Sequence, residues 1–245
     1  MPTCLNCGAM VVENFCPNCG QKKEVERLTW RSLVGEIFHF FTHLERGFLN
    51  TSWRLLIWPD RVIGEYLSGK RKKYFKPFSL YLIWVAIHLL AYQLIIGWMH
   101  YENLRTGQET QTFIVKHSNM FGLMLIPILA FVLWLIVTRS KLNYIESFAV
   151  IVYTFAAVEM LIFFQIVIVG LLLQRNFLTD RFLTQIQVVA SIWTFYCFAF
   201  LLRTGGIKYL IPRILLALVV GILINDKVSA LVAEIILKIK NHADA

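Results

Sequence analysis

Apolar residues in this chain are gathered into long uninterrupted runs, not spread at alternating or helical spacing. About twenty helical residues cover the hydrocarbon core of a bilayer. Five runs approach or exceed that length, at residues 78–98, 119–137, 147–173, 186–202 and 207–224. The pattern therefore predicts an all-α integral membrane protein with about five transmembrane helices, preceded by interfacial amphipathic helices.

The stretch ahead of the first run, residues 25–76, has apolar positions at helical spacing instead. It predicts one amphipathic helix over 29–45, a second over 51–58 and a third over 59–67. The third begins at a proline, before which a helix usually ends. Amphipathic helices that carry tryptophan lie in the plane of a membrane surface, and we expect that position here.

The last polar segment, residues 228–240, places its apolar side chains on one stripe. Glu234 and Lys238 form an i, i+4 pair on the other side. We expect a short amphipathic helix after the fifth apolar run. A single long helix through Asn225 and Asp226 is the alternative.

Five cations lie within seven residues directly before the first apolar run. They are Lys70, Arg71, Lys72, Lys73 and Lys76. Basic residues beside a span keep their loop on the cytoplasmic side, and each attracts anionic lipid by about 1 kcal/mol. The sequence therefore predicts a membrane protein with a cytoplasmic N-terminus and an anionic-lipid headgroup site.

Four of the five cysteines form two CxxC units near the N-terminus. They are Cys4, Cys7, Cys16 and Cys19. Gly8 and Gly20 follow the two units and can take the positive φ that points backbone amides at sulfur. Four thiolates at this spacing predict a zinc ribbon whose metal is structural, because no coordination position stays open. Iron in the same cage and a pair of disulfides are the alternatives.

These patterns divide the chain into a ribbon (1–24), an interfacial and basic belt (25–76), and a transmembrane bundle with a C-terminal amphipathic helix (77–240). The composition agrees: 58% of the 245 residues are hydrophobic and 16% are charged, against roughly 45–50% and 25% in soluble domains. The net charge of +9 suits anionic lipid. Nucleic acid is not expected, because no soluble basic helix interleaves with exposed aromatics.

A second metal site is conceivable on the first amphipathic helix. Glu36, His39 and His43 fall at i, i+3 and i+7, so they share one face. Two histidines four apart with a carboxylate can hold zinc. The alternative is a polar helix face in contact with water and headgroups.

His88, Glu159 and Arg213 are ionisable residues well inside the apolar runs, where a charge is costly. His88 and Glu159 are near the centres of the first and third runs, and Arg213 is in the fifth. A cluster of Glu159 with His88 or Arg213 would form a proton relay or substrate pocket. The alternative is a protonated Glu159 that holds two helices together by a hydrogen bond.

Several motifs ahead of the first apolar run resemble those of one bacterial family. They are the CxxCG pair, Glu36 with His39 and His43, Gly47-Phe48-Leu49, residues 59–71 and Tyr74-Phe75-Lys76-Pro77-Phe78-Ser79. On these motifs the chain resembles an uncharacterised family of multi-pass membrane proteins with an N-terminal zinc ribbon, a domain of unknown function. The resemblance implies an architecture and brings no activity with it.

No nucleophile elbow, P-loop, dinucleotide fingerprint or HExxH motif occurs in the sequence. We therefore expect a non-catalytic docking or scaffold protein whose ribbon and basic belt bind a protein partner or anionic lipid. The alternative is a transporter or lipid-handling protein that uses the region of Glu159, as a homo-oligomer because five spans make a small bundle. A membrane-surface metalloenzyme using the histidine pair is the third possibility.

Overall fold

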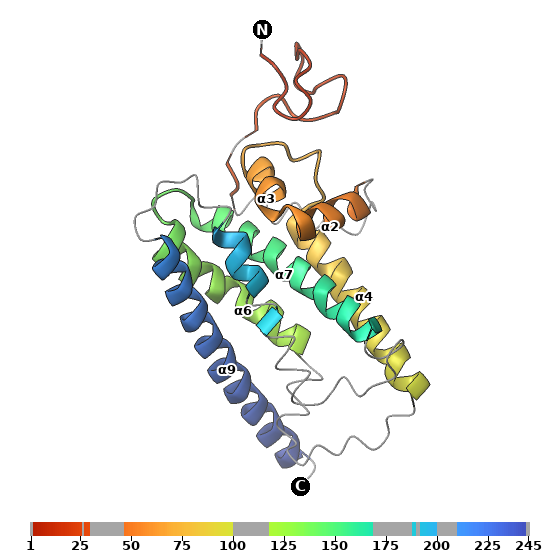
Figure 1. Ribbon diagram of the computed structural model, residues 1–245, viewed down its shortest axis with the longest axis vertical. Coiled ribbons are helices and arrows are strands. Elements are labelled where there is room, and N and C mark those ends of the chain that lie inside the picture. The colour runs from red at the N-terminus through yellow and green to blue at the C-terminus, as the bar shows by residue number, and fades with distance from the viewer. Residues whose placement is uncertain are drawn as a thin grey trace.

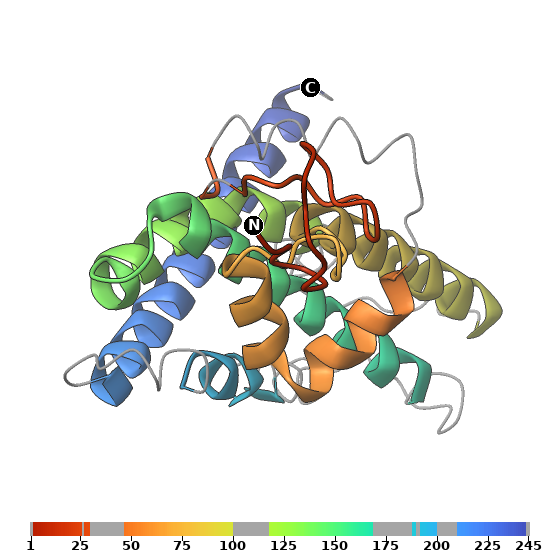
Figure 2. The ribbon, with the colours of Figure 1, turned by 90° about the horizontal axis from the view of Figure 1, so that it is seen from above.

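The computed structural model describes residues 2–25, 27–29, 47–99, 118–168, 188–189, 192–199 and 210–243. This part of the chain is helical apart from turns, loops and two isolated β-bridges near the N-terminus. Long helices form a bundle, two short helices cross one end of it, and the N-terminal segment lies beyond them (Figure 1). Seen from above, the short helices and the N-terminal segment lie over that end (Figure 2).

The two short helices are α2 (Phe48–Ile57) and α3 (Pro59–Leu67). Trp58 separates them with φ −132° and ψ 63°, outside the helical region. The ring of a following proline disfavours helical backbone at this position. The structure thus confirms the second and third predicted amphipathic helices and the break between them.

The side of α2 that faces the bundle buries two hydroxyl residues beside one leucine. Thr51, Ser52 and Leu55 are buried there. The backbone N–H of Phe75 donates to Thr51 Oγ1, and the indole Nε1–H of Trp84 donates to Ser52 Oγ, both at 2.9 Å. Buried hydroxyls that are hydrogen-bonded in this way fix the position of α2 on the bundle.

The outward side of α2 is apolar. Leu49 is 74% exposed and Trp53 is 62% exposed, and Ile57 is also exposed. These three residues follow one another at i, i+4 and i+8, so they form one stripe along the helix. Helix α2 therefore has exposed apolar side chains on its outward side in addition to the buried Leu55 on its inner side.

Four longer helices form the bundle: α4 (Pro77–Met99), α6 (Ser118–Leu133), α7 (Tyr144–Ile166) and α9 (Leu210–Ala243). Helix α6 continues into a π-helical turn, η1 (Trp134–Thr138). Helices α4 and α6 pack against α7, and α9 packs against α6 and η1. The start of α9, the loop after η1 and the start of α4 all lie at the end of the bundle that α2 and α3 cover (Figure 1).

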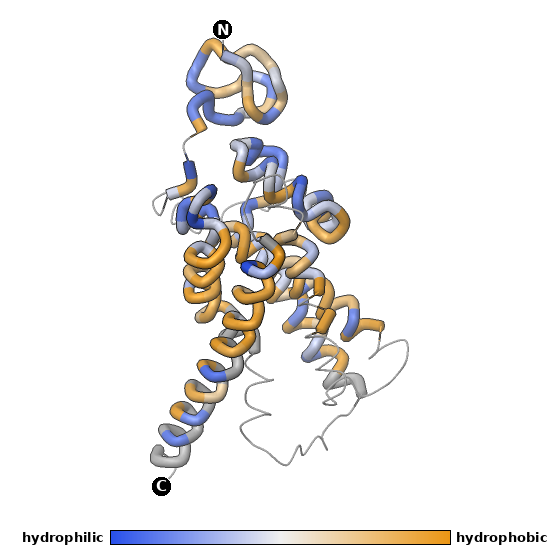
Figure 3. The backbone as a smooth tube through the Cα atoms, turned by 60° about the vertical axis from the view of Figure 1, so that its left-hand side comes forward, coloured by the Kyte–Doolittle hydropathy of each residue, from blue (hydrophilic) through white to orange (hydrophobic). Residues whose placement is uncertain are grey.

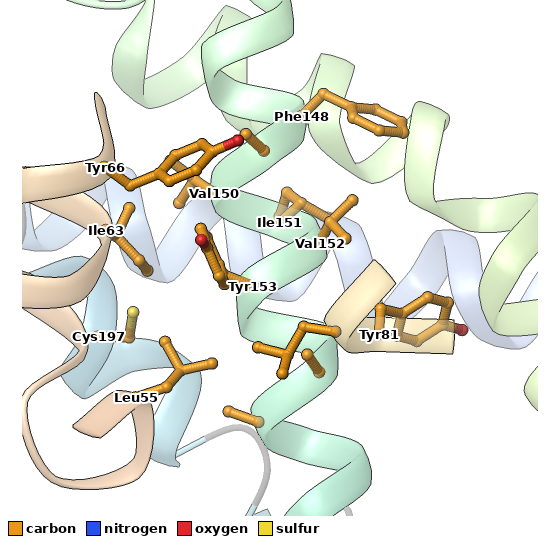
Figure 4. Packing of buried hydrophobic residues seen from close by; sticks show 14 of the residues in the cluster. Leu55, Ile63, Tyr66, Tyr81, Phe148, Val150, Ile151, Val152, Tyr153 and Cys197 are labelled. Atoms are coloured by element: carbon orange, nitrogen blue, oxygen red, sulfur yellow. The ribbon is translucent and has the colours of Figure 1, made fainter. Parts of the chain in front are cut away.

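Helix α7 is the centre of the bundle, with most of its residues buried. Its first turn is held by a capping box, in which Asn143 Oδ1 accepts from the N–H of Glu146 and Glu146 Oε2 accepts from the N–H of Asn143. Side chains from α2, α3 and residue 197 meet α7 near this end (Figure 4). The rings of Tyr66 and Tyr153 pack edge to face at 5.4 Å between centroids, which joins α3 to α7.

Two helical segments, Pro77–Ile95 and Tyr144–Ile166, are long and apolar enough to cross a membrane. Leu123–Thr138 and Ile211–Ile224 are apolar but shorter. Of the predicted fourth span, only residues 188–189 and 192–199 are described. The expectation of about five spans therefore stays a prediction, whereas the all-helical character is confirmed.

The C-terminal segment corrects one expectation. Helix α9 is continuous through Asn225 and Asp226, so residues 228–240 extend it and do not form a separate short helix. Two polar residues do not break a helix when neither is proline or glycine. The apolar upper part of α9 gives way to mixed polar and apolar residues toward the C-terminus (Figure 3).

Candidate metal centre and basic collar

The two CxxC units fold as a pair of matching turns. The N–H of Gly8 donates to Cys4 O at 2.9 Å, and the N–H of Gly20 donates to Cys16 O at 2.8 Å. Both glycines have positive φ, 76° and 69°, as the sequence predicts. A β-bridge between Thr3 and Met10 closes the first turn, and a β-bridge between Phe15 and Lys22 closes the second.

All four cysteines of these turns are free thiols whose sulfur atoms converge. The Sγ atoms of Cys4, Cys7, Cys16 and Cys19 lie within 4.8 Å of one another and could hold a metal ion. The Cys4–Cys19 and Cys7–Cys16 pairs are each 3.6 Å apart. The chain thus brings together the four residues that the spacing selected.

The local environment lowers the pKa of two of the cysteine thiols and raises the pKa of a third. A hydrogen bond from the backbone of Ala9 lowers the pKa of Cys7 to about 6, and one from the backbone of Cys7 lowers the pKa of Cys4. Removal from water raises the pKa of Cys19 to about 11. Four thiolates this close repel one another, so a bound cation is needed to hold all of them deprotonated.

Gln21 attaches this cysteine cluster to the turn after α3. Its side chain is buried, its Nε2 donates to Gly69 O at 2.8 Å, and its Oε1 accepts from the N–H of Lys72 at 3.3 Å. Gly69 has φ +105°, and a Cβ there would lie 3.1 Å from Leu5 Cδ1 and 3.4 Å from Val25 Cγ1. Only glycine fits both this backbone and this close approach.

The turn that Gln21 holds is the start of the basic collar, residues 70–76. Lys70 and Lys73 form ion pairs with Glu65 of α3, at 3.3 and 2.5 Å. The Tyr74 hydroxyl also donates to Glu65, at 2.7 Å. The hydrogen bond from Lys73, with that from Tyr74, lowers the pKa of the Glu65 carboxyl to about 2. Glu65 therefore stays ionised and fixes two of the five collar cations.

The other collar residues point elsewhere. Lys72 is exposed, and Lys72 and Lys76 have no carboxylate partner among the residues that the structure describes. The collar backbone is held to the bundle, because the hydroxyl of Tyr153 on α7 donates a hydrogen bond to Phe75 O at 2.6 Å. The collar thus carries two lysines paired with Glu65 and two lysines without an ion pair in the described part of the chain.

The linker between the cysteine cluster and α2 is bound to the start of α7. Arg27 donates to both carboxylate oxygens of Glu146, at 2.8 and 2.5 Å. Asn143 Nδ2 donates to Leu28 O at 3.3 Å, and the Leu28 side chain is buried in the main core. The ribbon is thus attached to the bundle at two places, the collar and the first turn of α7.

The intramembrane candidates separate into two sites. His88 Nδ1 and Glu159 Oε2 are 2.6 Å apart and both side chains are buried, which joins α4 to α7. Arg213 is exposed on α9 and lines a hollow beside Arg139. The expected cluster therefore contains His88 but not Arg213.

The candidates for a second metal site, Glu36, His39 and His43, lie outside the described residues. Sequence reasoning missed Gln21 and Glu65. Gln21 follows directly on the second CxxCG unit, and Glu65 is five residues before the first collar lysine, but neither position has a periodic signal. Only their hydrogen bonds across the fold reveal them.

Comparison with known proteins gives one match. The model of a family described as "Protein of unknown function (DUF3667)" matches residues 45–89. No curated protein and no solved structure is significantly similar to this chain. The matched residues include α2, α3, the basic collar and the first half of α4, so this chain contains a DUF3667 domain that ends one residue beyond His88.

Proposed function

We propose that this protein is a multi-pass bacterial inner-membrane scaffold with a cytoplasmic N-terminus and about five spans. In this proposal a zinc-loaded ribbon and the basic collar form a non-catalytic docking surface. The collar binds anionic lipid headgroups, and the ribbon binds a protein partner. The observation that carries the proposal is that Gln21 donates a hydrogen bond to Gly69 O and accepts one from the N–H of Lys72, because these two bonds make the collar depend on the folded ribbon.

The spacing of the sulfurs supports zinc as the metal. A tetrahedral Zn²⁺ site with Zn–S bonds of about 2.3 Å has sulfur atoms about 3.8 Å apart. Two of the sulfur pairs here are separated by 3.6 Å, and all four sulfurs lie within 4.8 Å of one another. Four protein thiolates fill the coordination sphere, so the ion would stabilise the ribbon and would offer no position to a substrate.

The location of polar and apolar groups supports the membrane. The two candidate spans start at the end of the bundle that carries the collar, α2 and the ribbon (Figure 1). At this end the apolar stripe of α2, Leu49 with Trp53 and Ile57, points away from the bundle. Apolar and tryptophan side chains beside free lysines are typical of a helix half-sunk in a charged bilayer surface.

The exposed surface of the ribbon supports a protein partner. Met10 is 65% exposed, Val12 is 77% exposed and Phe15 is 59% exposed. Three large apolar side chains on so small a unit exceed what a ribbon needs for its own folding, and apolar patches of this kind mark interaction sites. Their position beyond α2 and α3 keeps them clear of the membrane surface.

The test uses the full chain in cells and in lipid nanodiscs. Metal analysis should find one zinc per chain, and Cys7→Ser should lose it. Hydrogen exchange should then become faster in the Gly69–Lys72 turn while α7 keeps its protection. A photo-crosslinker at Val12 should give one dominant protein adduct in wild type and none in Cys7→Ser. A metal-free chain with an unchanged turn, or no adduct at Val12, would contradict the scaffold.

A second candidate, transport or lipid handling through Glu159, has one observation in its favour. The buried His88–Glu159 contact is of the kind that proton relays use. However, the hollow beside Arg213 and a cavity between α6, α7 and α9 are lined by other residues than His88 and Glu159. Proton uptake by proteoliposomes that Glu159→Gln abolishes would establish this function in place of the scaffold.

A further inference from the structure

The end of α6 and the start of α9 enclose an open hollow of about 600 Å³. Its walls come from η1, from the loop after it and from the first turns of α9. The lining residues are Leu135, Ile136, Val137, Arg139, Ser140, Arg213 and Leu216. The hollow lies at the end of the bundle that carries the ribbon, so it would face the cytoplasmic side of the membrane.

Two arginines from separate elements line this hollow, and none of its described lining residues is a carboxylate. Arg139 and Arg213 are both exposed, and neither forms an ion pair within the described part of the chain. The Arg139 guanidinium lies over the Trp134 ring, 5.6 Å from its centroid, which limits its conformations. Planar guanidinium groups bind phosphate oxygens in pairs, and Ser140 adds a hydroxyl donor.

The other walls of the hollow are apolar. Leu135 and Leu216 are about half exposed there, and Val137 is buried. A phospholipid matches this combination of side chains, because its charged headgroup can contact the arginines while its acyl chain contacts the leucines. The wall is also π-helical at η1, and π-helical turns in proteins occur frequently at functional sites.

A second cavity lies deeper along the same two helices. It has a volume of about 200 Å³ and an almost wholly apolar lining that includes Leu129 and Leu133 of α6 and Ala217 and Gly221 of α9. On α9, Ala217 and Gly221 follow Arg213 by one and two turns, roughly 6 and 12 Å at 1.5 Å per residue. That separation corresponds to the step from a lipid phosphate to its first acyl segments.

We propose that this hollow binds the phosphate of an anionic phospholipid between Arg139 and Arg213, with an acyl chain running along the α6–α9 seam. The proposal rests on the membrane location proposed above, but it is independent of the ribbon and of the collar. The same guanidinium pair would also accept free phosphate, so the experiment must separate a lipid headgroup from a soluble anion.

The experiment uses full-length protein, extracted in mild detergent, stripped of lipid and titrated with phosphatidylglycerol. Native mass spectrometry should show one tightly held lipid per chain. Arg139→Gln with Arg213→Gln should weaken that binding about tenfold or more, because two charge-assisted contacts are lost. Lys141→Gln is the matched control, since this exposed lysine lies in the same loop but does not line the hollow; it should bind as wild type does. Leu216→Trp should also weaken lipid binding, because the larger side chain fills the hollow while both arginines remain.

Three results would overturn the assignment. The double arginine variant could bind phosphatidylglycerol as tightly as wild type does. Phosphatidylcholine could bind equally well, which would remove the need for a net negative head. Millimolar inorganic phosphate could displace the lipid, which would make the ligand a soluble anion. Failure of the membrane location itself is separate, because the chain would then be recovered from cells without detergent.

Discussion

His88 on α4 and Glu159 on α7 are joined by a 2.6 Å contact between Nδ1 and Oε2, and less than a tenth of either side chain is exposed. Each residue satisfies the other through this contact, and loss of one leaves a buried polar group without its partner. The contact ties together α4 and α7, the two helices of the described part of the chain that are long and apolar enough to cross a membrane.

The first prediction concerns this pair. His88→Leu alone and Glu159→Leu alone should each lower the free energy of unfolding, whereas the double variant should recover part of the loss. We expect a coupling energy on the order of 1–2 kcal/mol, near the upper end for polar pairs between membrane helices. Unfolding by denaturant in detergent micelles measures it. Additive losses in the double variant would mean that the two side chains do not depend on each other.

The second prediction concerns acid. Because the pKa of Glu65 is about 2 when folded and about 4.3 in an unfolded chain, the ionised carboxylate stabilises the fold fully above pH 4.3. That contribution is lost as the pH falls from 4.3 toward 2. Its size is about 1–2 kcal/mol, because water screens a partly exposed group.

Glu65→Gln should remove this dependence, so the difference in melting temperature between wild type and variant should shrink steadily over that pH range. Glu24→Gln, at an exposed position of the linker, is the control. A constant difference between the wild-type and Glu65→Gln melting temperatures down to pH 2.5 would show that Glu65 is not the anchor of the collar lysines.

The third prediction compares two glycines near the end of α3. Gly69→Ala should destabilise the protein by about 1–2 kcal/mol, because φ +105° disfavours a side chain and Leu5 is in its way. Gly64→Ala, inside the helix with nothing within 4 Å, should be neutral or stabilising by up to about 1 kcal/mol. Thermal unfolding measures both changes, and zinc retention should fall only in Gly69→Ala. Equal effects would contradict the docking of the ribbon on this turn.

The fourth prediction concerns Trp53. If the apolar stripe of α2 is sunk in the bilayer surface, lipids brominated near the headgroup should quench Trp53. The quenched part of the fluorescence should fall in Trp53→Phe and persist in Trp84→Phe, because Trp84 is buried and bonded to Ser52. Quenching that is the same in wild type and Trp53→Phe would show that α2 stands clear of lipid.

Local chemistry made part of this structure predictable. Proline at position 59 fixes the α2–α3 boundary, and the two CxxC units with their glycines fix the four-sulfur cluster. Central positions in two apolar runs pointed to Glu159 and His88 as buried polar groups, although the sequence left either His88 or Arg213 as the partner of Glu159. In each case the chemistry of one residue type restricts the local structure: proline ends a helix, cysteine pairs converge on a metal, and an ionisable group inside an apolar run needs a polar partner.

Features that depend on contacts between distant segments were not predictable in the same way. Nothing local to Gln21 indicates that it reaches Gly69, 48 residues further along the chain. The depth of Arg213 in its apolar run suggested a membrane-buried partner, but helix rotation, which the run does not encode, turns it to the surface beside Arg139. The polar pair at 225–226 suggested a helix end, yet helix propensity without glycine or proline carries α9 across it.

The length of α9 has a consequence of its own. At 1.5 Å per residue its 34 residues measure about 51 Å. This length exceeds the thickness of the hydrocarbon core of a typical bilayer by about 20 Å. In the proposed membrane location, an uninterrupted helix that begins at the ribbon-bearing end of the bundle would therefore emerge on the far side of the bilayer (Figure 1). Ordered structure would then project into both aqueous compartments, and a label on Lys238 would report from the opposite face to one on Lys22.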